Sequence, residues 1–173
     1  MNNTRKLVLT AMFIAIGVVL PQAFHMIPNA GSVILPMHIP VLVAGFVLGP
    51  VYGLVCGLLT PVLSHLIFGM PPVPVLPSMI CELACYGLMT GLLYRVLKIE
   101  NGTVKIYVVL ILSMLCGRVL YGILNALIFR AGSYSLAAWT SAAFVTALPG
   151  IVIQLVLIPL LVSRLQKAHL IEA

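Results

Sequence analysis

Six apolar segments follow one another along the chain, separated by short stretches that carry prolines, glycines or charged residues. Most of these segments have the length of about 20 residues that a helix needs to cross a bilayer. They lack the alternation of apolar and polar residues that strands of a membrane barrel show, so helices are predicted. The expected helices cover residues 6–24, 37–48, 51–68, 76–97, 104–129 and 140–166.

The second and third segments form one apolar stretch over residues 37–68, which is too long for one helix and too short for two complete spans. Gly49-Pro50 is the natural break, and it leaves a second helix that is too short to cross the bilayer. The preceding residues 25–36 are interrupted by proline and glycine and are interpreted as a loop. We expect this loop to enter the outer half of the bilayer, against protein or a water-filled cavity.

Composition strengthens the membrane interpretation. Of the 173 residues, 62% are hydrophobic and 7% are charged, whereas about 25% of the residues of a soluble domain are charged. We therefore predict an all-α integral membrane protein, with six transmembrane helices in a single domain over residues 1–173. The net charge of +6 lies in short clusters without interleaved aromatic residues, so no nucleic-acid partner is expected.

The four cysteines lie inside apolar runs and are interpreted as small packing residues, because no further metal-ligand cluster accompanies them. They are Cys56, Cys81, Cys85 and Cys116. Neither a metal nor a cofactor is expected.

The lysines and arginines predict the orientation. If both termini lie on one side, seven basic residues collect there, Arg130 lies alone on the other side, and Arg118 falls inside a segment. Because basic residues mark cytoplasmic loops, both termini are predicted to be cytoplasmic. The seven residues are Arg5, Lys6, Arg95, Lys98, Lys105, Arg164 and Lys167.

Small residues recur at intervals of four in several segments, a spacing that lets helix backbones approach closely in lipid. We expect most of them to form internal helix contacts. The glycines concerned are Gly45, Gly49, Gly53 and Gly57 in the second and third segments, and Gly87 and Gly91 in the fourth.

Two ionisable residues, Glu82 and Arg118, lie well inside apolar segments. Such residues are costly in a bilayer and are functional candidates by default. At about 1.5 Å per residue, Glu82 lies roughly 9 Å and Arg118 roughly 16 Å from the outer ends of their helices. We therefore expect both in the outer half of the bundle.

The neighbours of these two residues extend each into a polar stripe. Arg118 shares one helix face with Tyr121 and Asn125, and Glu82 shares another with Ser78 and Tyr86. The two stripes are expected to face each other, with a histidine at the outer end of each of two further helices closing the ring. The candidate substrate-binding residues are Glu82, Arg118, Tyr121, Asn125, Ser78, His38, His65 and Tyr86.

Two interpretations of these residues stay open. Either they line a polar cavity that opens outward, or a Glu82–Arg118 ion pair fixes the packing of two helices. The histidines also have the alternative role of solvated or capping groups at the membrane interface.

Gln154 lies deeper in the last segment, and its side chain is interpreted as forming a hydrogen bond to another helix. The proline-rich stretch over residues 69–77 is expected to cover the mouth of the bundle, or to be a stiff surface connector.

Motifs of energy-using enzymes are missing from the sequence. No phosphate-binding loop of the form G-x-x-x-x-G-K-[ST] is present, so ATP hydrolysis by this chain is not expected. Neither HExxH, GxSxG nor a pair of carboxylates occurs, so the protein is not expected to be an enzyme. A site that binds, with energy supplied elsewhere, fits best; a small secondary transporter or a membrane assembly subunit without a small-molecule ligand are the alternatives.

Three stretches carry a resemblance to a known family: LTAMFIAIG, LPMHIPVLVAGFVLGPVYGLVCGLLTP and ELACYGLMTGLLYR. The first contains an Ala-xxx-Ala motif, the second a helix pair with a tight Gly-Pro turn, and the third a fourth helix. In this order they resemble the substrate-binding (S) component of energy-coupling factor (ECF) transporters.

The resemblance implies a multi-pass protein of a prokaryotic plasma membrane that binds a vitamin from outside. It also implies that Ala11 and Ala15 contact a membrane coupling (T) subunit, which works with two cytoplasmic ATPases. Arg118 suits a carboxylate, so a pantothenate-like substrate is expected. If Glu82 neutralises Arg118, a neutral pyrimidine or pyridine compound is equally expected.

Overall fold

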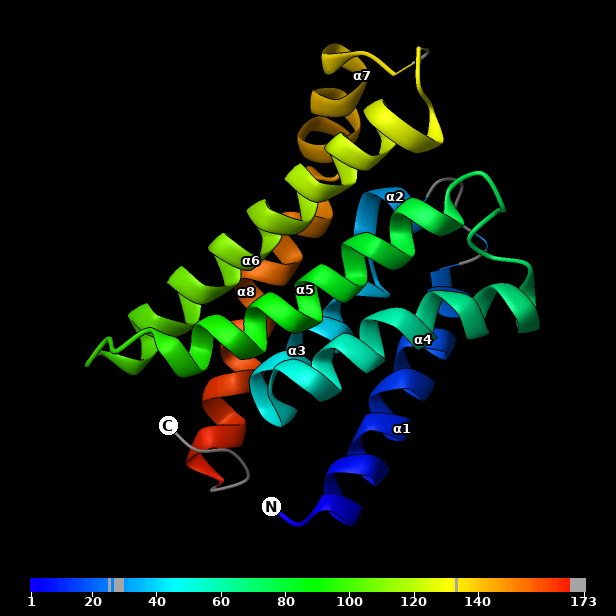
Figure 1. The fold of residues 1–173 in the computed structure, drawn as a ribbon. Coiled ribbons are helices and arrows are strands. Elements are labelled where there is room, and N and C mark those ends of the chain that lie inside the picture. Colours follow the sequence, from blue (N-terminus) through cyan, green and yellow to red (C-terminus); the bar gives the residue numbers. More distant parts are fainter. Residues whose placement is uncertain (25, 27–29, 133, 169–173) are drawn as a thin grey trace.

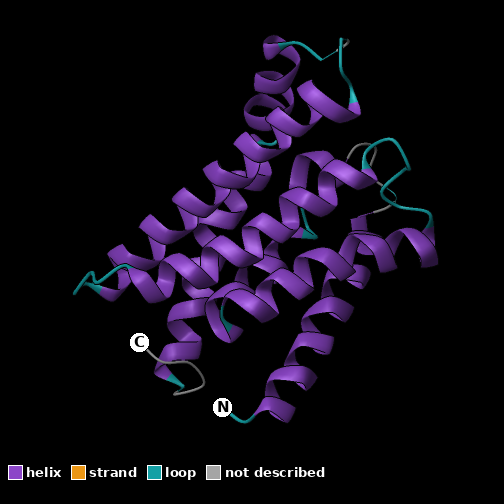
Figure 2. Ribbon diagram, in the orientation of Figure 1, coloured by secondary structure: helices purple, strands orange, loops and turns teal. Residues whose placement is uncertain are grey.

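The computed structural model describes residues 1–24, 26, 30–132 and 134–168, and all regular secondary structure within these ranges is helical (Figure 2). Six helical segments of the described residues are long and apolar enough to cross a membrane, as predicted. The elements are α1 (Asn3–Val19), η1 (Leu20–Phe24), α2 (Ala30–Ile34), α3 (His38–Leu48), α4 (Pro50–Phe68), α5 (Leu76–Val96), α6 (Gly102–Leu124), η2 (Asn125–Phe129), α7 (Leu136–Thr140), η3 (Ser141–Thr146) and α8 (Leu148–Lys167).

The helices form one bundle, in which the N-terminus and the end of α8 lie at the same end (Figure 1). The most extensive contacts join α4 to α5, α5 to α6 and α3 to α5, so that α5 is central. Large apolar side chains such as Leu7, Val96 and Val156 remain exposed on the outside. An exposed apolar surface of this extent matches a bundle that lies in lipid.

Local sequence signals explain where several helices begin and end. Asn101 caps α6, because its side-chain oxygen accepts hydrogen bonds from the backbone N–H groups of Thr103 and Val104, at 3.1 and 3.2 Å. Proline occupies the first turn of α4, where no N–H donor is needed. Gly49, with φ of +88°, forms the turn between α3 and α4 that the sequence predicts.

The expectation of an irregular loop over residues 25–36 is wrong for its second half. Ala30–Ile34 form the short helix α2, and the chain turns through Leu35, whose φ is +54°, before α3 begins. Residues 25 and 27–29 lie outside the described residues. Together α2 and α3 make the membrane-crossing segment Gly31–Leu48, so a broken helix supplies the length that α3 lacks.

Glycines hold α3, α4 and α5 in close contact. A Cβ atom added to Gly53 would collide with the backbone of Gly87, and one added to Gly57 would collide with the backbone of Leu83. Gly45 likewise lies against the backbone at Gly87. The prediction that these small residues mark internal helix contacts is confirmed, and close backbone approach is what such spacing permits in lipid.

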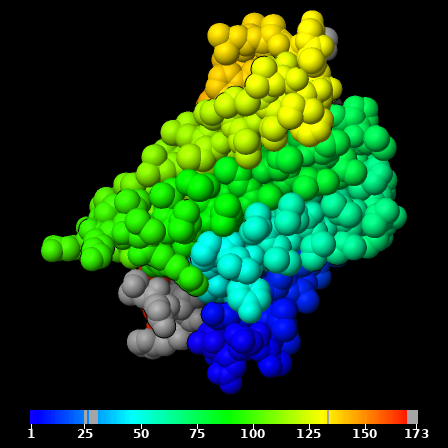
Figure 3. Space-filling model, in the orientation of Figure 1, coloured from blue at the N-terminus to red at the C-terminus, as the bar shows by residue number. Residues whose placement is uncertain are grey.

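The expected sixth helix, residues 140–166, is divided in the structure. Here α7 and the π-helical turn η3 precede α8, and the π-helical turn η2 ends the preceding span. The part of the chain that carries α7 stands out from one end of the molecule (yellow to orange in Figure 3). Single π-helical turns are often found at functional sites, and both of these lie at the end of the bundle opposite the termini (Figure 1).

Candidate functional site

Three helices bring a carboxylate, a guanidinium and an imidazole together inside the bundle. Glu82 on α5 lies 3.0 Å from Arg118 on α6, measured from Oε1 to Nη1. The hydroxyl of Tyr86, one turn along α5, donates to the same carboxylate oxygen at 3.0 Å. His38, the first residue of α3, places Nε2 at 3.7 Å from the other oxygen of Glu82. The two predicted polar stripes therefore do meet.

The four side chains are almost closed to solvent: Glu82 is 3% exposed, Arg118 7%, His38 2% and Tyr86 1%. Burying two opposite charges is costly unless further hydrogen bonds accompany the pair. The hydroxyl of Tyr86 supplies such a hydrogen bond to Glu82, and the imidazole of His38 lies close to the other carboxylate oxygen. The charged groups thus occupy a closed interior position, in which the Glu82–Arg118 ion pair is formed.

Arg118 is only partly satisfied by this arrangement. Its Nη1 faces Glu82, but Nε and Nη2 are buried without a hydrogen-bond partner among the described residues. Nε–H and Nη2–H point in parallel from one edge of a guanidinium, and this edge matches the two oxygens of a carboxylate. A buried donor without a partner is unfavourable, so this edge is where a ligand acceptor would be stabilised.

Two further buried groups of the predicted site also keep unused hydrogen-bonding capacity. Asn125, at the start of η2, donates from Nδ2 to the carbonyl of Tyr121 at 2.8 Å, while its Oδ1 has no partner among the described residues. Both ring nitrogens of His38 also lack a hydrogen bond to any of the described residues, although Nε2 lies near Glu82. The site thus offers both donors and an acceptor.

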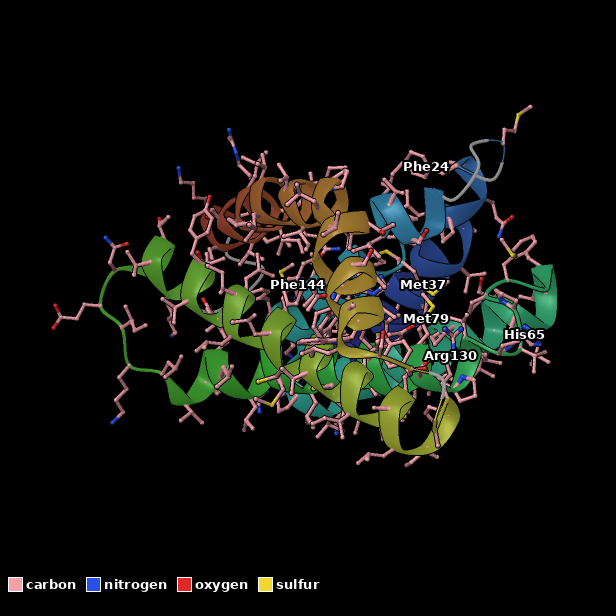
Figure 4. The ribbon with its side chains drawn as sticks, turned by 90° about the horizontal axis from the view of Figure 1, so that it is seen from above. Phe24, Met37, His65, Met79, Arg130 and Phe144 are labelled. Atoms are coloured by element: carbon pink, nitrogen blue, oxygen red, sulfur yellow. The ribbon has the colours of Figure 1, made fainter. Side chains whose placement is uncertain are left out.

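Two of the remaining predicted residues, Ser78 and His65, are held by local contacts. The hydroxyl of Ser78 donates to the carbonyl of Val75 at 3.0 Å, within the first turn of α5. Nδ1 of His65 lies 2.7 Å from the carbonyl oxygen of Pro71. In Figure 4 His65 lies at the far end of α4, away from Met37 and Met79 in the middle of the bundle. Its contact therefore joins the proline-rich loop to the end of α4.

A separate groove lies on the surface beside the charged site, between α6 and the segment that leads into α7. It has a volume of about 270 Å³ and is lined mainly by apolar side chains, among them Val119, Ile123 and Leu136. Trp139 lines it too and donates from Nε1 to the backbone carbonyl of Arg118 at 3.0 Å. The groove is apolar and the charged site is not, so the two are chemically distinct.

Apolar side chains surround the charged groups. Leu83 on α5, Met114 on α6 and Met37 before α3 belong to the same buried cluster as Tyr86. Such surroundings exclude water and strengthen electrostatic interactions with whatever occupies the site.

The sequence match decides the family. Residues 5–162 match the family described as "ECF transporter, substrate-specific component", which is nearly the whole chain. The chain belongs to this family. Comparison with curated proteins and comparison with solved structures each give no match.

Membership makes this S component a substrate-binding membrane subunit that takes part in uptake by an ECF transporter. The family also implies partner subunits and a small-molecule substrate. Its binding role agrees with a buried site that offers donors and acceptors.

The two alanines expected at a partner interface, Ala11 and Ala15, are both exposed on α1. The buried side of α1 is formed by other residues, including Thr10, Ile14 and Val18. The alanines are therefore free of the internal packing of this chain, and their face is open to a neighbouring protein or to lipid.

Gln154 on α8 is the residue that sequence reasoning underestimated. It is 0% exposed, yet neither Oε1 nor Nε2 has a hydrogen-bond partner among the described residues. The expected hydrogen bond between helices is thus not formed within this part of the chain. The sequence does contain a signal that could have singled out Gln154, because an amide in the middle of an apolar span needs a partner.

Proposed function

We propose that this S component binds a water-soluble vitamin or related micronutrient with high affinity from the extracellular side. It delivers the compound as part of an ATP-driven ECF transporter in the plasma membrane of a prokaryote. A membrane coupling subunit and two cytoplasmic ATPases supply the energy, because the chain carries no phosphate-binding loop of its own.

The free edge of Arg118 is the observation that carries the proposal. Nε and Nη2 are buried and unpaired among the described residues, while Nη1 is held by Glu82. A carboxylate on this edge would accept two parallel charge-assisted hydrogen bonds. The preferred substrate is therefore a small carboxylated compound with further hydroxyl or amide groups, of which pantothenate is an example.

The free edge of Arg118 is positioned indirectly by three neighbouring residues, Glu82, His38 and Tyr86. Glu82 fixes one end of the guanidinium at 3.0 Å, and Tyr86 fixes Glu82 through its hydroxyl. A guanidinium held in this way loses little conformational freedom when a ligand binds, which favours affinity.

The ion pair itself favours a second class of ligand. Because Glu82 lies against Arg118, the site can balance its own charge and accept a neutral compound, such as a pyrimidine or pyridine. In that case the unpaired N–H groups of Arg118 would donate to ring nitrogens or carbonyl oxygens.

The exposed face of α1 supports a contact with the coupling subunit. Ala11 and Ala15 are exposed and one turn apart, and small residues at this spacing let another helix approach closely. Through this contact, changes that ATP drives in the partner subunits are proposed to reach this chain and the vitamin bound to it.

Binding of radiolabelled pantothenate to protein purified in mild detergent tests the substrate. Pantothenate should bind roughly 10- to 100-fold more tightly than pantothenol, which lacks the carboxylate, because charge-assisted hydrogen bonds are lost. Equal affinity would favour the neutral class, and mass spectrometry of small molecules released from the purified protein would then identify it.

Uptake measurements separate the proposed function from its alternatives. Vesicles that contain only this chain should accumulate no vitamin, whereas vesicles with the coupling subunit, the ATPases and ATP should. Accumulation by the lone chain under an ion gradient would contradict the proposal and indicate a secondary transporter. Absence of any bound small molecule would indicate an assembly subunit.

A further inference from the structure

Gln154 lies in the row of α8 residues that faces the interior. Gly150, Gln154, Ile158 and Val162 follow one another at intervals of four and are all buried. Ile158 and Val162 belong to the same apolar cluster as Tyr86 and Leu83. Because residues four apart lie on one helix face, the amide of Gln154 points into the same interior as the charged site.

The depth of Gln154 in the bundle follows from one close contact. A Cβ atom at Gly150 would collide with the backbone of Val33 and Ile34, so α8 touches α2 at this level. Gln154 lies one turn further along α8, and His38 lies four residues further along the chain from Ile34. Both α3 and α8 run toward the end of the bundle that holds the termini (Figure 1), and they pack against each other. Gln154 is therefore close to the level of His38.

The amide of Gln154 combines a donor and an acceptor, and both are unsatisfied among the described residues. A buried amide without partners costs free energy, and packing alone would be served better by an apolar side chain of the same size. Asn125, at the start of η2, contributes a second buried amide oxygen without a partner in the described part of the chain.

We infer that Gln154 is a substrate-binding residue, and that the substrate carries a group with both a hydrogen-bond donor and an acceptor. An amide, a lactam or an aminopyrimidine edge has this chemistry. This inference rests on the proposed function, and it extends the site from α3, α5 and α6 onto α8. It also narrows the substrate class, because a compound that presents only acceptors at this position, such as a carboxylate, would leave Oε1 of Gln154 unpaired.

The test uses Gln154→Met, which keeps the length of the side chain and removes both polar atoms. Val156→Met, at an exposed position of the same helix, is the matched control. In protein freed of bound small molecules, Gln154→Met should raise the melting temperature by about 2–4 °C, because an unpaired buried amide is removed. Val156→Met should leave it unchanged. A lower melting temperature for Gln154→Met would overturn the inference, since the amide would then be a structural contact.

Binding of pantothenate provides the second measurement. Gln154→Met should weaken binding at least about 10-fold and retain the preference for pantothenate over pantothenol, because Arg118 is intact. Unchanged binding would overturn the inference. If the wild-type protein binds no pantothenate, the pantothenate-like substrate of the proposed function fails. The role of Gln154 is then decided by two other measurements. One is the melting temperature of the Gln154→Met variant, and the other is mass spectrometry of small molecules that the wild-type protein retains and the variant loses.

Discussion

The indole of Trp139 donates a hydrogen bond from Nε1 to the backbone carbonyl of Arg118, at 3.0 Å. The same ring packs edge-on against Phe144, with centroids 5.5 Å apart, and lies directly against Gly122. The side chain of Trp139 thus connects the segment around α7 to Arg118, one of the residues of the charged site. Its fit depends on Gly122, because a Cβ atom there would enter the indole ring.

Trp139→Phe should weaken ligand binding several-fold. The substitution removes one hydrogen bond, which contributes about 1 kcal/mol, and frees the segment around α7 from α6. Gly122→Ala should give a similar loss by a different route, since it displaces the indole. Binding of radiolabelled pantothenate to the two variants is the measurement.

The control for this pair is Ile123→Val, a change next to Gly122 at an exposed side chain, which should leave affinity unchanged. If Trp139→Phe and Gly122→Ala both bind as the wild type does, the contact between Trp139 and Arg118 has no role in the site.

Arg118→Lys distinguishes charge from shape in the candidate site. Lysine keeps a positive charge beside Glu82 but lacks the parallel N–H groups of the guanidinium. The variant should fold and insert, and its affinity for pantothenate should fall at least about 10-fold. Wild-type affinity in this variant would remove the guanidinium edge from the site.

Arg118→Ala is expected to lose binding and also to be less stable by about 3–5 kcal/mol, because Glu82 is left as an unpaired buried charge. A double variant with Arg118→Leu and Glu82→Leu removes both charges and should regain stability without binding. Thermal melting in detergent measures both effects. Binding by the double variant would show that the pair only fixes helix packing.

Much of the fold follows from the sequence because the bilayer restricts the solutions. A backbone in lipid must satisfy its own hydrogen bonds, so each apolar segment of sufficient length becomes a helix. The glycines at intervals of four predicted which surfaces would touch, and Gly53 against Gly87 is one such contact. The helix α2 was missed because its glycine and flanking prolines are typical of loops, whereas contact with α8 at Gly150 stabilises it.

The candidate site was predictable where helix spacing determines it. Glu82 and Arg118 were expected to meet, and they do. Spacing cannot show how a side chain is used, and three residues illustrate this limit: His65 bonds to Pro71, Ser78 to Val75 and Asn125 to Tyr121. Gln154 shows the reverse case, because the expected partner is missing among the described residues.

Gly87→Ala should destabilise the bundle, since its Cβ would collide with the backbone of Gly53 on the neighbouring helix. Forcing two packed helices apart costs about 1–3 kcal/mol or more. Gly102→Ala, at the start of α6 with open space around it, is the matched control and should have little effect. Melting temperature and the yield of monodisperse protein in detergent compare the two variants; equal behaviour would contradict close packing at Gly87.

Ala15→Trp tests the proposed partner face on α1. Ala15 is exposed and does not belong to the buried side of α1, so a large ring there should leave folding and ligand binding unchanged. On a surface that another helix must approach closely, the same ring prevents association. We therefore expect pantothenate binding at wild-type affinity, together with loss of ATP-driven uptake in vesicles that contain the coupling subunit and the ATPases.

Ile111→Trp is the control for a bulky ring on an exposed apolar surface, since Ile111 is exposed on α6. This variant should retain both binding and uptake. If Ala15→Trp lost binding, its face would pack inside the chain after all; if it kept full uptake, the coupling subunit would contact another surface. Pull-down of the coupling subunit by each variant separates failed association from failed delivery, because only failed association is expected when the close approach between helices is blocked.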